Sequence, residues 1–328
     1  MATPDPAATR PGPRCSDAAR ERQDPMVGTA PWQARFLLVE QESGWAYDGF
    51  PSTPLPDDVK AEVLERAAAL GARVMLIRRP GRQSSSVCYL RAWCVVDTLA
   101  PAGHRVTWGT YAYPAELLAG LDRLDQLARW QEEGTDVGAT GVPGGDDEPI
   151  VLVCTHAKKD VCCAVRGRPV ASALAASRPE QTWECSHTGG DRFAANMVLL
   201  PDGATYGGLD VAAAERVLEA HGHGTPDTAH LRGVVGRPRP VQAAVVAVHD
   251  QLGPLPWGSV VPTGTEPLEP ADGEATATLV RLRVGDGREV EVEVREHDRE
   301  PARLTCLAAG PKVSRVPVAG TVRTVVPG

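Results

Sequence analysis

The chain of 328 residues has no apolar run close to the ~20 residues that a membrane-spanning helix needs. Residues 1–23 also lack an apolar segment of the kind that marks a secretory signal. Lysine is scarce and the formal net charge is -8, which makes nucleic acid an unfavourable partner. The eight cysteines are spaced unevenly, unlike those of a disulfide-stabilised secreted domain. We therefore expect a cytoplasmic protein in a reducing compartment, with neither a membrane nor nucleic acid among its partners.

Motifs of several enzyme classes are missing as well. Gly189-Gly190 lacks the Lys-Ser/Thr ending of a phosphate-binding loop, and Ser84-Ser85-Ser86 has no Gly-x-Ser-x-Gly context. We find no flavin or nicotinamide motif, and no Cys-x-x-Cys pair of the kind that thiol oxidoreductases use. The sequence also gives no basis for pairing two carboxylates as in a glycosidase. These absences leave the cysteines as the main source of chemistry.

The apolar pattern predicts an α/β fold, because strand-like runs alternate with segments of helical periodicity. Strands are predicted at 36–40, 74–77, 87–96, 106–111, 151–154, 197–200 and 205–208, and helices at 59–70, 115–127, 169–176, 211–221 and 241–252. Near the C-terminus, runs at 276–284 and 288–296 flank Gly285-Asp286-Gly287 and predict a β-hairpin. A further strand is predicted at 304–308.

The same pattern suggests four segments. Residues 1–31 are rich in Ala, Pro, Asp and Arg and are expected to be disordered. Residues 32–147 form an N-terminal α/β region that ends in a Gly- and Asp-rich linker. Residues 148–224 have the element order of a small thioredoxin-like domain. Residues 231–328 form a small C-terminal α+β region, a helix followed by the β-hairpin.

Half of the cysteines lie in the central stretch from Val151 to Gly208. Cys154 ends an apolar run nine positions before Cys163, and His187 lies four positions before Asp191 on a glycine-rich loop. Thiolate and imidazole are ligands of zinc and of iron–sulfur clusters. Zinc sites usually contain cysteines separated by roughly two to four residues, a spacing that this stretch lacks. A cluster is larger than a single ion and tolerates the wider loop.

Several segments of this stretch together carry a family resemblance. They are Cys154-Thr-His-Ala-Lys-Lys-Asp-Val-Cys-Cys163, His187-Thr-Gly-Gly-Asp191-Arg-Phe-Ala-Ala-Asn196, Leu200-Pro-Asp-Gly203 and Tyr206-Gly207. They resemble the sucrase/ferredoxin-like family. The resemblance implies a thioredoxin-like ferredoxin domain with a [2Fe–2S] cluster, held in some members by two cysteines on one iron and two histidines on the other. Cys154, Cys163 and His187 match ligand positions, and Asp191 stands where the second histidine is expected.

The resemblance also implies a function. It indicates an electron carrier that receives electrons from a reductase and passes them to an unknown acceptor, rather than a stand-alone enzyme. No sucrase activity is expected, because the sequence has no sugar-site signature. The alternatives are a zinc-binding or metal-free structural or interaction module, and a thiol oxidoreductase that uses Cys162 or Cys163.

Two ligand positions stay open in the sequence. Cys162 adjoins Cys163 and is a substitute for it. Cys185 lies two residues before His187, so that both side chains would point the same way on an extended segment. Thiolate is a better iron ligand than carboxylate, which favours Cys185, whereas Asp191 holds the position that the family motif assigns to a ligand. Cys15 and Cys306 have no local partner and are expected to be unligated.

Basic residues gather near these candidate ligands in a chain that is acidic overall. They are Lys158, Lys159, Arg166, Arg168 and Arg192. Cations near an anionic cluster would stabilise it and raise its reduction potential. They would also attract an acidic electron-transfer partner.

Overall fold

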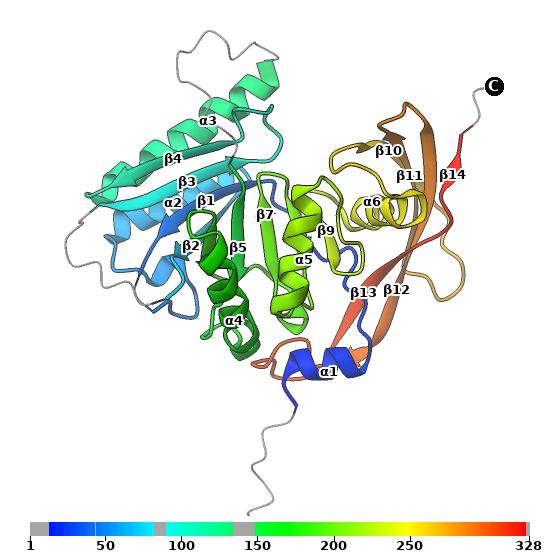
Figure 1. The fold of residues 1–328 in the computed structure, drawn as a ribbon, viewed down its shortest axis with the longest axis horizontal. Coiled ribbons are helices and arrows are strands. Elements are labelled where there is room, and N and C mark those ends of the chain that lie inside the picture. The colour runs from blue at the N-terminus through cyan, green and yellow to red at the C-terminus, as the bar shows by residue number, and fades with distance from the viewer. Residues whose placement is uncertain (1–12, 43, 82–89, 134–147, 326–328) are drawn as a thin grey trace, which may run out of the picture.

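Figure 1 shows a mixed α/β protein with two separate sheets. The structure is a computed structural model that describes residues 13–42, 44–81, 90–133 and 148–325. A nine-stranded mixed sheet has the strand order β4-β3-β1-β2-β6-β5-β7-β8-β9, and a five-stranded antiparallel sheet follows it in the chain. No helix within the described ranges has both the length and the apolar content needed to cross a membrane.

Strands β1 to β4 and two helices form the first half of the nine-stranded sheet. Their bounds are β1 Arg35–Glu40, α2 Asp57–Ala69, β2 Ala72–Arg78, β3 Arg91–Asp97, β4 Val106–Tyr111 and α3 Leu118–Glu133, with 3-10 helices at Phe50–Ser52 and Pro114–Leu117. Because β1 and β2 are parallel, α2 is the crossover between them. Alternation along β1 sends Leu37 and Val39 toward α2 and α3, and Phe36 and Leu38 to the opposite face.

The second half of the sheet repeats this arrangement. Its elements are β5 Ile150–Cys154, α4 Val161–Ser177, β6 Thr182–Cys185, β7 Met197–Leu200, β8 Ala204–Tyr206, α5 Val211–Gly222 and β9 Leu231–Val234, with a 3-10 helix, η5, at Asp191–Phe193. Strands β5 and β6 are parallel, and α4 connects them. Helices α4 and α5 cover the face that carries Val151 and Val153. The loops after β5 and β6 therefore leave the sheet at the same edge.

The two halves are one continuous sheet that folds back on itself. Ile77 of β2 pairs with Cys185 of β6 in antiparallel register. Trp108 of β4 stacks on Trp183 of β6 with ring centroids 5.5 Å apart, although three strands separate β4 from β6 in the sheet. Arg105 reaches Asp202 in the β7–β8 turn at 3.1 Å. The faces without helices thus form a shared apolar core between the two halves.

A second sheet and helix α6 complete the fold (Figure 1). The elements are α6 Arg239–Leu252, β10 Val260–Leu268, β11 Thr276–Val284, β12 Glu289–Ala302, β13 Lys312–Ala319 and β14 Arg323–Thr324. Residues 241–249 of α6 are all buried, because the helix contacts β9 of the large sheet on one side and the small sheet on the other. A helix that is apolar on most sides requires such an enclosed position.

The expected α/β class is confirmed, and most predicted elements lie where the periodicity placed them. The helix predicted at 169–176 begins earlier, at Val161, because Asp160 caps it: its Oδ1 accepts a hydrogen bond from the Cys162 backbone N–H at 2.8 Å. The strand predicted at 304–308 is a turn. Strands β6, β9, β10, β13 and β14 were not predicted. Strands β6, β9 and β14 have four residues or fewer, and β10 and β13 contain proline, which usually marks an edge strand or a strand end.

The N-terminal segment also differs from expectation. Residues expected to be disordered include helix α1, Cys15–Glu21, with Cys15 and Ala19 buried. Arg20 of this helix donates hydrogen bonds to the carbonyl oxygens of Ala194 and Gly208. These contacts are distant in sequence, so local composition does not reveal them. Residues 1–12, Cys88 and most of the predicted linker near 131–148 lie outside the described residues.

The buried histidine of α6 predicts a pH-dependent stability. His249 stacks on Trp257 with ring centroids 5.8 Å apart, and burial lowers the pKa of His249 to about 4. In the unfolded chain the His249 imidazole takes up a proton at about pH 6.5, well before it does so in the folded protein. The contribution of neutral His249 to the free energy of unfolding is therefore complete above about pH 6.5 and is lost as the pH falls toward 4. His249→Phe keeps a ring on Trp257 but removes the titration. Its melting temperature should therefore fall less than that of the wild type between about pH 7 and about pH 5.

Thermal denaturation at the two pH values measures this difference. His223→Gln, at an exposed position near the end of α5, is the matched control and should keep the wild-type pH dependence. An equal loss of melting temperature in His249→Phe and the wild type would contradict the prediction.

Candidate metal centre

Two fully buried cysteines meet where β5 ends and α4 begins. Cys154 is the last residue of β5 and Cys163 lies in the first turn of α4. The neighbouring Cys163 thiol lowers the pKa of Cys154 to about 6, and the Cys154 thiol together with burial raises the pKa of Cys163. Gly167 allows this approach, because a Cβ there would lie 2.1 Å from the Cys154 carbonyl oxygen. Helix α4 can therefore pack directly on the end of β5.

His187 and Asp191 come from the loop after β6, beside the β5–α4 loop. Asp191 Oδ1 lies 3.2 Å from Cys163 Sγ and 3.0 Å from His187 Nδ1. Burial opposes ionisation of Asp191, but contact with His187 and with the Cys163 thiol holds its pKa below the usual range. The Asp191 side chain is 4% exposed and that of His187 is 27% exposed. The four side chains thus form a chain of contacts that runs from the buried thiols to the surface.

Cys185 lies beside this group but not in its chain of contacts. It is the register partner of Cys154 across β5 and β6, and it is buried in the shared apolar core. Burial raises the pKa of Cys185 well above its usual value. Cys185 Sγ makes no hydrogen bond to another described residue, whereas Asp191 contacts two of the other candidates.

Cys162 points away from Cys163. Neighbouring positions on an α-helix are rotated by about 100°, and Cys162 instead contacts Cys15 at 3.6 Å and Cys306 at 3.5 Å. Its position is therefore not that of a substitute for Cys163. The adjacent cysteines belong to two different groups of side chains. Cys163 belongs to the first cluster, which consists of Cys154, Cys163, His187 and Asp191, and Cys162 belongs to the second cluster, which consists of Cys15, Asp160, Cys162 and Cys306.

Two arginines that the sequence analysis did not single out flank the first cluster. Arg232 of β9 is fully buried and donates hydrogen bonds to the Gly189 carbonyl oxygen and to Asn196 Oδ1, at 3.1 and 2.8 Å. Burial lowers the pKa of Arg232 to about 10, while the negative charges of Asp191 and Cys154 oppose that shift. No ion pair joins Arg232 to a carboxylate in the part of the chain that the structure describes. Arg73 donates a hydrogen bond to the His187 carbonyl oxygen.

The basic residues expected around the site are more dispersed. Lys159 lies over the Tyr47 ring, 3.9 Å from its centroid, and borders a pocket beside His187. Arg166 pairs with Asp17, and Arg192 lies 3.5 Å from Asp24. The two remaining cations, Lys158 and Arg168, line a different pocket. Lys159 is thus the one of the five that borders the pocket at His187.

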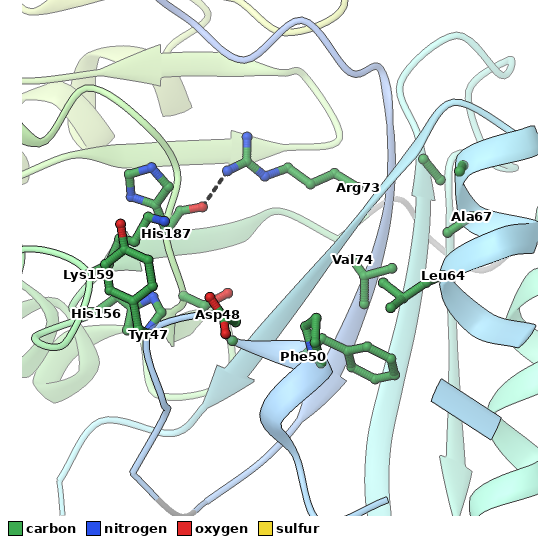
Figure 2. Close-up of a pocket in the computed structure, with 15 residues that line it drawn as sticks. Tyr47, Asp48, Phe50, Leu64, Ala67, Arg73, Val74, His156, Lys159 and His187 are labelled. Carbon is green, nitrogen blue, oxygen red and sulfur yellow. Dashed lines mark hydrogen bonds between the residues drawn. The ribbon is translucent and has the colours of Figure 1, made fainter. Parts of the chain in front are cut away.

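A pocket of about 390 Å³ opens at the exposed end of the first cluster (Figure 2). Its polar lining includes Asp48, Arg73, His156, Lys159 and His187. His156 Nε2 lies 2.7 Å from the Ala46 carbonyl oxygen, so Nε2 carries the proton. Burial lowers the pKa of His156, and its backbone N–H donates a hydrogen bond to the Cys154 sulfur.

Comparison with known proteins adds one decisive finding. Residues 26–233 match the family model described as sucrase/ferredoxin-like. The chain belongs to the sucrase/ferredoxin-like family. The matched region contains the whole first cluster, whereas α1 and the small C-terminal sheet lie outside it. No curated protein and no solved structure matches the chain.

The second cluster of this sucrase/ferredoxin-like protein was not foreseen from the sequence. Cys15, Asp160, Cys162 and Cys306 each place a ligand atom within 4.8 Å of the others, so the group can hold a metal ion. Cys15 and Cys306, expected to be unligated, lie outside the family match and meet Cys162 only in the folded chain. No sequence spacing could reveal this group, since Cys15 and Cys306 are 291 positions apart.

The two glycines at the first cluster predict unequal effects of substitution. Gly189 and Gly190 both have positive φ, at +88° and +73°. A Cβ at Gly190 would lie 2.4 Å from Arg232 Nη2, whereas Gly189 has open space around it. Alanine imposes backbone strain at both positions, but only Gly190→Ala also displaces the buried guanidinium. We expect Gly190→Ala to lower the free energy of unfolding by about 1–3 kcal/mol more than Gly189→Ala.

Urea denaturation of the two variants measures the difference, with Gly189→Ala as the control for backbone strain. Equal losses in the free energy of unfolding would show that contact with Arg232 is not the reason why position 190 requires glycine.

Proposed function

We propose that this protein carries a [2Fe–2S] cluster and transfers single electrons. Cys154, Cys163, His187 and Asp191 would hold the cluster. The observation that carries the proposal is the chain of contacts from two buried thiols through Asp191 to His187. This donor set places sulfur at one end and nitrogen or oxygen at the other. It suits two irons with different ligands, as in centres where histidines replace cysteines on one iron.

The extent of the first cluster supports a group larger than one ion. Within the described residues, ligand atoms that all lie within 4.8 Å of one another occur at Cys15, Asp160, Cys162 and Cys306, and not at the first cluster. A mononuclear zinc ion requires its ligands to converge on one point. The first cluster is extended instead, which favours a binuclear centre over zinc.

Charge around the first cluster supports an anionic occupant. Two thiolates and one carboxylate carry more negative charge than a [2Fe–2S] core neutralises. Arg232 is a buried cation without an ion-paired carboxylate within the described ranges, and a buried charge is costly unless it is compensated. The backbone N–H of His156 adds positive potential at Cys154, and the guanidinium of Arg73 adds it at His187. Such donors raise the reduction potential of a cluster.

The bound cluster would accept and release one electron at a time. His187 is the partly exposed member of the set and borders the pocket with Arg73 and Lys159. We propose this face as the point of electron exchange with a reductase and with an acceptor whose docking surface is acidic. A reducing cytoplasm is part of the proposal, because the ligand cysteines must remain thiols.

Thiol oxidoreductase activity is a weaker alternative. Cys154, Cys162 and Cys163 are each 0% exposed, so a protein or peptide disulfide has no direct access to their sulfurs. A redox-active thiol normally needs a partly exposed position.

The first test is the iron and sulfide content of the protein. Anaerobically purified protein should contain about two irons and about two acid-labile sulfides per chain and absorb visible light. Cys154→Ser and Cys163→Ser should each lose most of this iron and sulfide, because a hydroxyl is a poor replacement for a thiolate. Cys94→Ser, at a buried cysteine of β3 outside both clusters, is the control and should retain them. Stoichiometric zinc at Cys154 and Cys163 without sulfide would refute the proposal.

The fourth ligand is tested by a pair of variants. Asp191 contacts Cys163 and His187, whereas Cys185 lies in the apolar core, so we expect Asp191→Ala to lose or destabilise the cluster. Cys185→Ser should keep the visible spectrum. Asp191→His should bind the cluster more stably than the wild type, because imidazole is a softer ligand than carboxylate. Absorption spectra and iron release to a chelator measure these effects, and the opposite pattern would assign Cys185 as the ligand.

A further inference from the structure

We propose that Cys15, Cys162, Cys306 and Asp160 form a second metal site, which binds one tetrahedral ion of the zinc type and joins both ends of the chain to helix α4. The three sulfurs lie at the corners of a nearly equilateral triangle. Their separations are 3.6 Å for Cys15–Cys162, 3.5 Å for Cys162–Cys306 and 3.6 Å for Cys306–Cys15.

This triangle has the size that a single tetrahedral ion requires. With a Zn–S distance of about 2.3 Å, tetrahedral geometry places the sulfurs about 3.8 Å apart. The observed separations are within a few tenths of an ångström of that value. A two-iron cluster would bind at most two of the three thiolates on one iron and hold the third farther away. Three equal separations therefore favour one ion over a cluster.

Asp160 supplies the fourth ligand. Its Oδ2 lies 3.4 Å from Cys15 Sγ and accepts the Cys306 N–H at 2.7 Å, while Oδ1 caps α4. A carboxylate oxygen has a further lone pair with which to bind an ion. Asp160 is 0% exposed, and none of the ion pairs between described residues includes it. A buried carboxylate without a cation is costly, and a divalent ion at the centre of the group would compensate it.

Neighbouring donors support thiolates at this position. The backbone N–H and the hydroxyl of Ser16 both donate hydrogen bonds to the Cys162 sulfur. Arg166 Nε donates to Ser16 Oγ at 2.9 Å, which leaves the Ser16 hydroxyl proton free for Cys162. Hydrogen bonds of this kind orient metal-bound thiolates. The cluster is largely buried, with only Cys306 partly exposed, and soft thiolates in a closed tetrahedral site select zinc.

The ion would have a structural role, because it would join three segments that are far apart in the chain. Its ligands come from α1, from the start of α4 and from the turn between β12 and β13. Without the ion, few apolar contacts hold these segments together. The Asp160 cap and the packing of α4 on the end of β5 hold Cys163 independently of Cys15 and Cys306, so loss of the ion should leave the first cluster in place.

The test is elemental analysis of the full-length protein, purified without chelators from medium containing zinc and iron. We expect about one zinc per chain in addition to any iron. Cys15→Ser and Cys306→Ser should each lower zinc at least about tenfold, because each removes one ligand. Both variants should keep iron and sulfide if the first cluster holds them, and the Cys94→Ser control should keep both metals.

A measurement on the wild type guards against variants that fail to fold. Zinc should be released when a mercurial reagent titrates the thiols, and replacement by cobalt should give thiolate-to-cobalt charge-transfer absorption. Folded wild-type protein with neither zinc nor cobalt binding would overturn the proposal, as would a disulfide between any two of the three cysteines. Loss of iron and sulfide from Cys15→Ser and Cys306→Ser, with zinc absent throughout, would overturn both proposals. Zinc without iron or sulfide would support this site and refute only the electron carrier.

Discussion

The cap on helix α4 is the interaction on which both clusters depend. The Asp160 carboxylate accepts the Cys162 N–H and so fixes where the helix begins and how its first turn is oriented. Successive residues in that turn face different directions, and Cys162 and Cys163 therefore enter separate clusters. The same carboxylate accepts the Cys306 N–H from the C-terminal part of the chain. One side chain thus combines a local helix signal with a contact between distant segments.

The sheet supplies the second constraint. Parallel pairing of β5 and β6 brings the loop that leads to Cys163 next to the loop that carries His187 and Asp191. The approach of α4 to β5 depends on Gly167, and the course of the second loop depends on Gly190, which packs on Arg232. The absence of a side chain at Gly190 leaves the space that the Arg232 guanidinium occupies.

The sequence predicted the parts of the fold and site that depend on short-range patterns. A compact apolar run located β1, and helical periodicity located α5. Cys154, Cys163, His187 and Asp191 stood out because they lie within one motif. The contributions of Arg73, Arg232, Cys15 and Cys306 could not be foreseen, since each depends on a contact with residues far away in the chain. The composition of residues 1–31 likewise gave no indication of α1, whose burial comes from tertiary contacts.

The pairing of β2 with β6 bears on how far the protein can be divided. Among the described residues, only Ile77–Cys185 and Arg78–Glu184 join the two halves of the sheet in register, yet the fold-back adds the Trp108–Trp183 stack and a common core. A fragment limited to residues 148–224 would lose β9 from one side and β2 from the other. Its two open strand edges would carry unpaired N–H and C=O groups beside exposed apolar side chains, a combination that favours self-association. The region that carries the first cluster is thus not a portable module, and its solubility depends on the rest of the chain.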